Sequence, residues 1–195
     1  QLSAHIGIAH TRWATHGVPS ERNAHPHISG GLAVVHNGII ENFESIKADL
    51  QGKGYVFESE TDTEAIAHLV HYKLQGSTDL FEAVRQATNE LVGAYAIGVV
   101  AEADPFRVIV ARRGSPLAIG YGEGEVFVGS DALALAPLTN RVSYLEEGDH
   151  AILTREAVEV FDAAGRPVTR EIVTVPADNL YAEKGPYKHF MAKEM

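Results

Sequence analysis

The order of local patterns along the chain is the feature that most restricts its fold. Before Gly93, three segments carry apolar residues at helical spacing. After it, the chain changes to short β-rich runs separated by Gly, Pro and Asp. Helices are predicted over residues 41–52, 63–74 and 79–92, with a short fourth helix over 131–138. Helices and strands segregated in this way predict an α+β protein in layers, with two sheets and the helices outside them.

The strands are predicted from short apolar runs bounded by turn residues. Two of them precede the helices, at residues 4–11 and 32–36. The others follow at residues 94–101, 107–111, 117–119, 126–129, 142–145, 150–154, 158–161 and 171–175. From residue 176 the pattern fades, which predicts a connector and no further packed element.

Composition narrows the class of partner. The chain has 195 residues and a net charge of −10, and its Lys and Arg residues are scattered along it. Nucleic acid is bound through a dense positive face, so we expect no nucleic-acid partner. There is no apolar run of bilayer length and no visible secretory signal, so we expect no membrane partner and a cytoplasmic protein. The sequence contains no cysteine, which removes disulfides, thiolate metal sites and a cysteine nucleophile.

The densest group of polar residues is HTRWATHG at residues 10–17. It places a cation, hydroxyls, an indole and two imidazoles directly after a predicted strand. An Arg with a nearby hydroxyl is suited to holding a carboxylate through a bidentate, charge-assisted pair. The alternative is a polar loop with one buried Trp, and composition alone favours that alternative.

The second motif is His36-Asn37-Gly38, at the end of an apolar run. The Asn37 amide offers an N–H₂ donor, and Gly38 lets its backbone N–H approach a ligand closely. Two fixed donors of this kind would suit an oxyanion hole. The alternative is a hairpin turn, because Asn-Gly is the commonest hairpin signal, and the motif taken alone favours the turn.

The third motif is SETDTE at residues 59–64, where the second helix begins. An acidic residue here could bind a substrate ammonium group. The alternative, which the motif alone favours, is a helix start whose acidic residues complement the helix dipole.

Two further patterns have structural interpretations. The ten histidines include the pairs His25/His27 and His68/His71, but no HExxH motif and no thiolate accompanies them, so we expect no metal site. The run GYGEG at 120–124 lies between two strand-like segments with no helix after it. It predicts a hairpin turn and argues against a dinucleotide fingerprint.

The three motifs, in this order, resemble class II glutamine amidotransferase domains. The resemblance covers nearly the whole chain. The residues of the motifs are most similar to those of members that make glucosamine 6-phosphate from fructose 6-phosphate and glutamine. The segments that carry it are HTRWATHG (10–17), NAHPH (23–27), VVHNGIIEN (34–42), SETDTE (59–64), GAYA (93–96), RRGSPLAIG (112–120), GSDALAL (129–135) and LEEGD (145–149). The resemblance implies a four-layer αββα sandwich of the N-terminal-nucleophile type, here incomplete.

The resemblance also implies roles for individual residues. In such domains an N-terminal cysteine attacks the side-chain amide of L-glutamine, releases ammonia and leaves a glutamyl thioester for water to hydrolyse. Asn37 and Gly38 would form the oxyanion hole, and Asp62 would bind the α-ammonium group. The other implied roles concern the loop at 10–17: Arg12 and Thr15 would hold the α-carboxylate, His16 would lie beside them, and Trp13 would cover the site and gate ammonia.

The resemblance further implies what the chain lacks. We expect residues 1–178 to form the glutaminase domain without its N-terminal segment, and 179–195 to be a connector toward an absent sugar isomerase domain. Without the cysteine, the chain is expected to be inactive alone. The parent would use L-glutamine and no cofactor, meet fructose 6-phosphate only through the isomerase domain, and form a homo-oligomer. The alternatives are a non-catalytic glutamine-binding module and an amidotransferase that serves a different acceptor.

Overall fold

The computed structural model describes residues 5–12, 16–77 and 79–176. Its helices are a short 3-10 helix η1 (Glu21–Asn23), α1 (Phe43–Gly52), α2 (Asp62–Gln75), α3 (Leu80–Glu90) and α4 (Ala132–Leu135). Its strands are β1 (His27–Ser29), β2 (Leu32–Ile40), β3 (Gly93–Ala101), β4 (Asp104–Arg113), β5 (Ala118–Tyr121), β6 (Val126–Gly129), β7 (Arg141–Tyr144), β8 (His150–Leu153), β9 (Val158–Phe161), β10 (Pro167–Val168) and β11 (Val173–Thr174).

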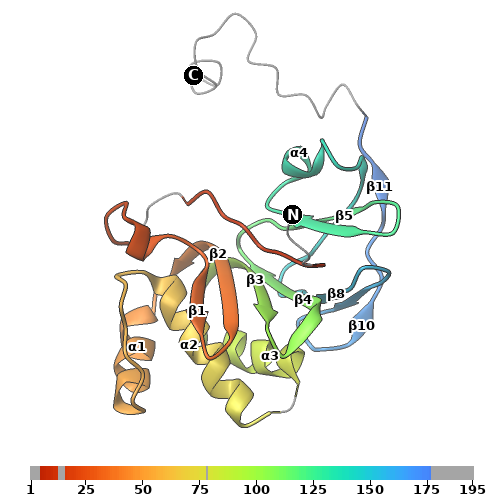
Figure 1. Cartoon of the computed structure of the whole chain (residues 1–195). Coiled ribbons are helices and arrows are strands. Elements are labelled where there is room, and N and C mark those ends of the chain that lie inside the picture. The colour runs from red at the N-terminus through yellow and green to blue at the C-terminus, as the bar shows by residue number, and fades with distance from the viewer. Residues whose placement is uncertain (1–4, 13–15, 78, 177–195) are drawn as a thin grey trace, which may run out of the picture.

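The strands form two sheets. The larger has the order β1-β2-β3-β4-β8-β9-β10, and the smaller has the order β11-β7-β5-β6 (Figure 1). Every pair of neighbouring strands in these two sheets is antiparallel. Helices α1, α2 and α3 lie together beside the larger sheet, whereas α4 lies over the smaller one.

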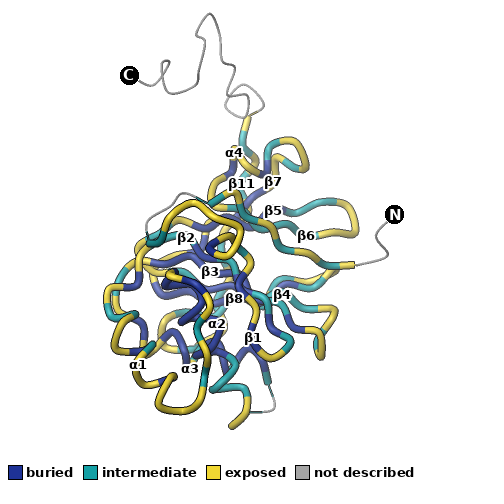
Figure 2. The backbone as a smooth tube through the Cα atoms, turned by 60° about the vertical axis from the view of Figure 1, so that its left-hand side comes forward, coloured by how far each residue is buried: buried dark blue, intermediate teal, exposed yellow. Residues whose placement is uncertain are grey.

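Three apolar clusters show that these elements make four layers. The first cluster joins α1, α2 and α3 to the larger sheet, the second joins the two sheets, and the third joins the smaller sheet to α4. Because successive side chains of a strand point to opposite faces, single strands serve two clusters. In β4, for example, Ile109 belongs to the helix side and Val110 to the space between the sheets. The buried part of the backbone runs through the middle of the molecule, as Figure 2 shows.

The helix starts follow capping rules. Thr61 precedes α2 and accepts a hydrogen bond from the Glu64 N–H, while Asp79 precedes α3 and accepts one from the Phe81 N–H. The first nine residues of α2 are all buried, polar ones included. The beginning of α2 is therefore an interior element, which places its polar residues inside the protein.

Most of the predicted elements are confirmed, with ends that differ by a few residues. The four predicted helices correspond to α1, α2, α3 and α4, although the last shrinks from 131–138 to four helical residues. The strand predicted at 4–11 is wrong over residues 5–11, where the chain is irregular; residue 4 lies outside the described ranges. An apolar run becomes a strand only when its backbone groups find a partner strand, and none of the described strands pairs with this one.

The turn interpretation of Asn37-Gly38 is also wrong. Both residues lie inside β2, where they face Ala96 and Tyr95 of β3. The hairpin that joins β1 to β2 turns instead at Gly30-Gly31, both with positive φ, as such tight turns require. The hairpin predicted around residues 120–124 is confirmed, because β5 and β6 pair on either side of it.

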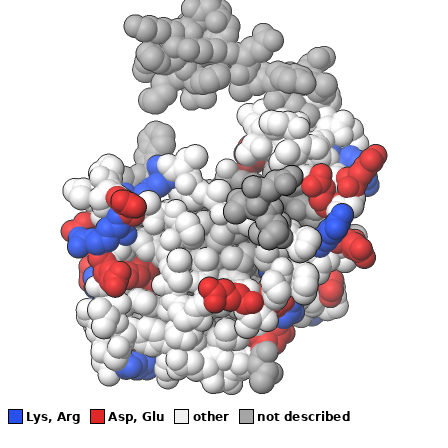
Figure 3. Space-filling model, in the orientation of Figure 1, with Lys and Arg blue, Asp and Glu red and all other residues white. Residues whose placement is uncertain are grey.

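Two further properties concern the helices and the surface. No helix in the described ranges is long and apolar enough to cross a membrane. On the face drawn in Figure 3, Lys and Arg side chains occur in small groups beside Asp and Glu, in keeping with the net charge of −10.

Candidate active site

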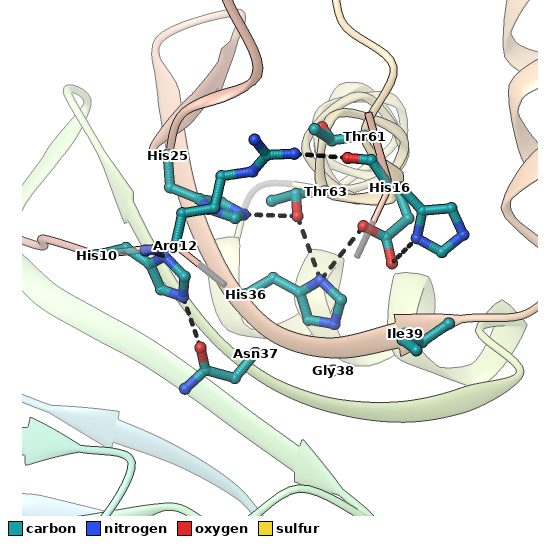
Figure 4. Close-up of a pocket in the computed structure, with 11 residues that line it drawn as sticks. His10, Arg12, His16, His25, His36, Asn37, Gly38, Ile39, Thr61 and Thr63 are labelled. Atoms are coloured by element: carbon teal, nitrogen blue, oxygen red, sulfur yellow. Dashed lines mark hydrogen bonds and ion pairs between the residues drawn. The ribbon is translucent and has the colours of Figure 1, made fainter. Parts of the chain in front are cut away.

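The three sequence motifs meet at one cavity of about 350 Å³, a size typical of small-molecule sites. Its lining comes from β2, from the beginning of α2 and from irregular chain on either side of η1 (Figure 4). The residues that line it are His10, Arg12, His16, His25, His36, Asn37, Gly38, Ile39, Thr61, Asp62 and Thr63. Residues that are up to 53 positions apart in the chain are thus neighbours.

Asn37 and Gly38 are held by the pairing of β2 with β3. Gly38 has a φ of +131°, and a Cβ atom added there would lie 2.1 Å from the Ala94 carbonyl oxygen. Only glycine fits this position, for conformation and for space. The Asn37 Oδ1 atom lies 2.5 Å from Nε2 of His10. Asn37 and Gly38, the two residues predicted to form an oxyanion hole, both line the cavity.

Asp62 is the first residue of α2 and is 3% exposed. Its Oδ2 atom accepts a hydrogen bond from the Ile40 N–H at 3.0 Å. The Nδ1 atoms of His16 and His36 each lie 3.8 Å from a carboxylate oxygen, beyond hydrogen-bonding distance. The helix N-terminus stabilises this buried anion, and the remaining carboxylate lone pairs are suited to an incoming cation.

Glu64 lies on the same helix but has a different task. Its carboxylate accepts hydrogen bonds from the Glu58 N–H, the Ser59 N–H and the Ser59 hydroxyl at 2.6–2.8 Å. Burial by itself raises the pKa of Glu64, but hydrogen bonds, from His68 first and then from Glu58 and Ser59, outweigh it and lower the pKa to about 2. Of the acidic residues in the third motif, Asp62 therefore faces the cavity and Glu64 fastens the preceding loop.

Arg12 lines the cavity from irregular chain. Its φ is +47°, a left-handed conformation that is uncommon for a residue with a side chain. Its guanidinium group donates hydrogen bonds to the carbonyl oxygens of His16, Gly17 and Val18 at 2.6, 3.0 and 3.1 Å. The arginine therefore braces the loop beside it, and its predicted role toward a carboxylate stays a prediction. Trp13 and Thr15 lie outside the described residues.

A hydrogen-bonded histidine cluster forms part of the cavity wall: His25 and His36 line the cavity, and His27 lies next to them. His25 Nε2 is 2.7 Å and His36 Nδ1 3.2 Å from the Thr63 hydroxyl, while His27 Nε2 is 2.9 Å from the Thr61 hydroxyl. Burial is the largest cause that lowers the pKa of each of these histidines; for His25, the neighbouring His10 adds to it and the pKa falls to about 3.

The sequence offered this cluster as the His25-Pro-His27 pair, for which hydrogen-bonded or surface histidines were favoured over a metal site. In the described part of the chain, no group of three His, Cys, Asp or Glu side chains is arranged to hold a metal ion. The second pair, His68 and His71, lies outside the cavity lining, and both rings contact the Ser29 hydroxyl.

Comparison with known proteins agrees with this geometry. The sequence profile of the glutamine amidotransferase domain matches residues 10–137. The chain is 56% identical to the glutamine–fructose-6-phosphate aminotransferase (isomerizing) of Vibrio cholerae serotype O1. The alignment covers the whole of this chain and 32% of that protein. It is 55% identical to 32% of the enzyme of the same name from Zymomonas mobilis. The chain thus spans about a third of the length of these curated relatives.

Solved structures support the fold. The glutamine phosphoribosylpyrophosphate amidotransferase of B. subtilis, complexed with ADP and GMP, aligns with a TM-score of 0.65 and 28% identity over 79% of this chain and 34% of that one. The four-layer α+β sandwich of the N-terminal-nucleophile type, predicted from the resemblance, is confirmed. Because the profile matches well over half of its residues, the chain belongs to the glutamine amidotransferase domain family.

Proposed function

We propose that this chain is the glutamine-binding part of a class II glutamine amidotransferase, with L-glutamine in the cavity between β2, α2 and the irregular chain around Arg12. The observation that carries the proposal is the meeting of Asn37, Gly38 and a buried Asp62 at a single cavity. Free glutamine bears an α-ammonium group, an α-carboxylate and a side-chain amide, and these residues match that set of groups.

The buried Asp62 carboxylate would bind the α-ammonium group, because a charge at 3% exposure needs a counter-ion or several donors. Arg12 would bind the α-carboxylate. To do so, its guanidinium would exchange bonds to the loop carbonyls for a charged acceptor, and bonds of the second kind are about twice as strong. Asn37 and Gly38 would then face the side-chain amide and stabilise the oxyanion that forms on it.

The nucleophile has to come from outside these residues. The chain contains no cysteine, and the amide carbon of glutamine must be attacked before its C–N bond can break and ammonia can leave. We therefore expect a protein of these 195 residues to bind glutamine without hydrolysing it. Joined to a segment that begins with cysteine, it would hydrolyse glutamine to glutamate and ammonia.

The acceptor is proposed from the relatives' names. Both curated relatives described above are glutamine–fructose-6-phosphate aminotransferases, so ammonia released here would serve the formation of glucosamine 6-phosphate from fructose 6-phosphate. That step would use a further site for the sugar phosphate.

Two measurements on the same preparation test the proposal. Calorimetric titration with L-glutamine should show binding that falls at least tenfold in Asp62→Asn and is unchanged in the control Asp49→Asn, whose side chain is exposed. Ammonia release should be absent from the chain alone. It should appear when a segment that begins with cysteine and completes the domain is fused ahead of residue 1. Release by the chain alone would overturn the mechanism, and absence of release from the fusion would overturn the assigned activity.

A further inference from the structure

His10 connects two residues of the cavity that lie in different parts of the chain. Its Nδ1 atom accepts a hydrogen bond from the Arg12 backbone N–H at 2.8 Å, and its Nε2 atom lies 2.5 Å from Oδ1 of Asn37. Figure 4 shows the ring standing between the Arg12 segment and β2, with the amide oxygen of Asn37 turned toward it. The ring is thus engaged on both of its nitrogens.

The hydrogen-bond partner of Nδ1 determines whether Nε2 of His10 carries a proton. A backbone N–H can only donate, so the Nδ1 atom that faces Arg12 must be the unprotonated, accepting nitrogen. A neutral imidazole carries one proton, which must then be on Nε2. His10 therefore donates to Asn37 from Nε2, and the amide oxygen is the end of Asn37 that can accept this bond.

This bond has a consequence for the other end of the amide. With its oxygen bound to His10, the Asn37 side chain directs its NH₂ group away from the ring. Rotation of the amide by half a turn would set N–H groups of His10 and Asn37 against each other and would present an oxygen where an oxyanion is to form. Both effects cost energy, so the ring selects the orientation in which Asn37 is a donor.

The ring is itself held in place. His10 packs against His25 with ring centroids 4.2 Å apart, and His25 is fixed in turn by the Thr63 hydroxyl at 2.7 Å. On its other side, the ring accepts the hydrogen bond from the Arg12 backbone N–H. The Arg12 backbone and the histidine cluster thus both hold this one imidazole.

We infer that His10 is a positioning residue: through its Nε2 proton, it orients the Asn37 amide so that the NH₂ group serves as a donor in the oxyanion hole. The inference rests on the proposed function for its catalytic meaning, whereas the orientation itself is a property of the chain alone. His10 acts through Asn37, so its loss should lower kcat and leave KM nearly unchanged.

The proton position can be measured without any substrate. In long-range ¹H–¹⁵N NMR spectra of the 195-residue chain at neutral pH, His10 should show the pattern of an imidazole protonated at Nε2. The proton on Nε2 should exchange slowly with water. In Asn37→Ala, the same tautomer should persist, because Arg12 fixes it, but the Nε2 proton should exchange faster. An Nδ1-protonated ring, or an averaged signal in the unsubstituted chain, would overturn the inference.

Two substitutions separate the two bonds of His10. His10→Gln keeps a donor near the position of Nε2, and His10→Asn keeps an acceptor near the position of Nδ1. In the fusion that carries the cysteine-led segment, we expect His10→Asn and His10→Ala to lower kcat about 10- to 100-fold. This is less than the 10²- to 10³-fold expected for loss of an oxyanion donor, and His10→Gln should retain most of the rate.

Thermal unfolding of the same variants is the control. If His10 were merely structural, the Gln and Asn variants would lose kcat equally. That result would contradict the positioning role. If the fusion with His10 intact shows no activity, the proposed function fails, while the NMR result still decides whether His10 orients Asn37.

Discussion

The two walls of the cavity are built in different ways. One, the strand wall, consists of His36, Asn37 and Gly38 on β2 together with Asp62 and Thr63 at the start of α2. The other, the loop wall, consists of His10, Arg12 and His16, from chain that is irregular at residues 10–12 and 16–18. Strand β2 pairs with β3 along all nine of its residues, and α2 begins in the interior. In the loop wall, Arg12 donates to carbonyl groups of its own loop, and His10 provides the contacts to Asn37 and His25.

The difference matches what each wall has to supply. Donors to an oxyanion and a buried carboxylate act through fixed geometry, which paired strands and helix ends provide at little cost when a ligand binds. An arginine that captures a free carboxylate can move, and irregular chain permits that movement. We therefore expect changes in the strand wall to be costly for folding and changes in the loop wall to affect mainly binding.

The largest expected effect comes from adding one methyl group to the strand wall. In Gly38→Ala, the new Cβ would lie 2.1 Å from the Ala94 carbonyl oxygen at a φ of +131°. Strain and overpacking together should lower the free energy of unfolding by about 3 kcal/mol or more. The matched control is Gly7→Ala, where a Cβ would meet nothing within 4 Å, and it should change stability by less than about 0.5 kcal/mol. If urea unfolding showed the same loss of free energy of unfolding for Gly38→Ala and Gly7→Ala, the strand wall would not be the more rigid of the two walls.

A smaller loss is expected from the loop that leads into α2. Glu64→Gln replaces a carboxylate that accepts from the Ser59 N–H and hydroxyl with an amide that cannot accept from both partners equally well. We expect a loss of about 2 kcal/mol at pH 7, and no comparable change for Glu58→Gln, whose side chain is exposed.

The same carboxylate gives a pH dependence with a defined sign. The native pKa of Glu64 is about 2, against an ordinary value of 4.5. Its contribution to stability is complete above pH 4.5 and is lost as the pH falls from 4.5 toward 2. Urea unfolding at several pH values should therefore show that the deficit of Glu64→Gln shrinks in that range. A deficit that stays constant would show that the charge is not what Glu64 contributes.

Sequence reasoning succeeded where local patterns and tertiary context agree. The helical spacing of Leu80, Val84 and Leu91 predicts α3, and the structure buries those residues. It failed at Asn37-Gly38 because the pairing of β2 with β3 overrides a turn signal that is purely local. It failed at residues 5–11 because an apolar run does not reveal whether a partner strand lies beside it. The bond between His10 and Asn37 joins residues 27 positions apart, which no spacing rule could supply.

Acidification should lower the stability of the fold through His25, which contacts His10 of the loop wall and Thr63 of the strand wall, before it affects Glu64. Burial, helped by the charges of His10 and His27, lowers the pKa of His25 to about 3 from 6.5. Between these two pH values, His25 is protonated in the unfolded chain but not in the folded chain. The free energy of unfolding therefore loses nothing to His25 above pH 6.5 and declines as the pH falls toward 3. His25→Gln cannot titrate and should flatten the decline between pH 6.5 and 4.5, whereas His5→Gln, at an exposed position, should not. Identical pH profiles for the two variants would exclude His25 as a source.

The smallest effect on folding is expected from Arg12, and it tests the loop wall directly. The guanidinium bonds of Arg12 brace only its own loop, so Arg12→Ala should lower the free energy of unfolding by less than about 1 kcal/mol. Its effect on glutamine should be much larger, because a charge-assisted bond to the α-carboxylate is worth about 1.5–3 kcal/mol, or roughly 10- to 100-fold in affinity. The control is Arg22→Ala, an exposed arginine in the neighbouring η1.

Calorimetry with glutamine and urea unfolding on the same Arg12→Ala sample separate the two properties. If Arg12→Ala binds glutamine normally, Arg12 only stabilises its loop, and another part of the cavity binds the α-carboxylate. A variant that loses several kcal/mol of stability would mean that the loop wall is as much a part of the folded framework as β2. Only a large loss of affinity with a small loss of stability supports a movable arginine that faces a fixed set of donors.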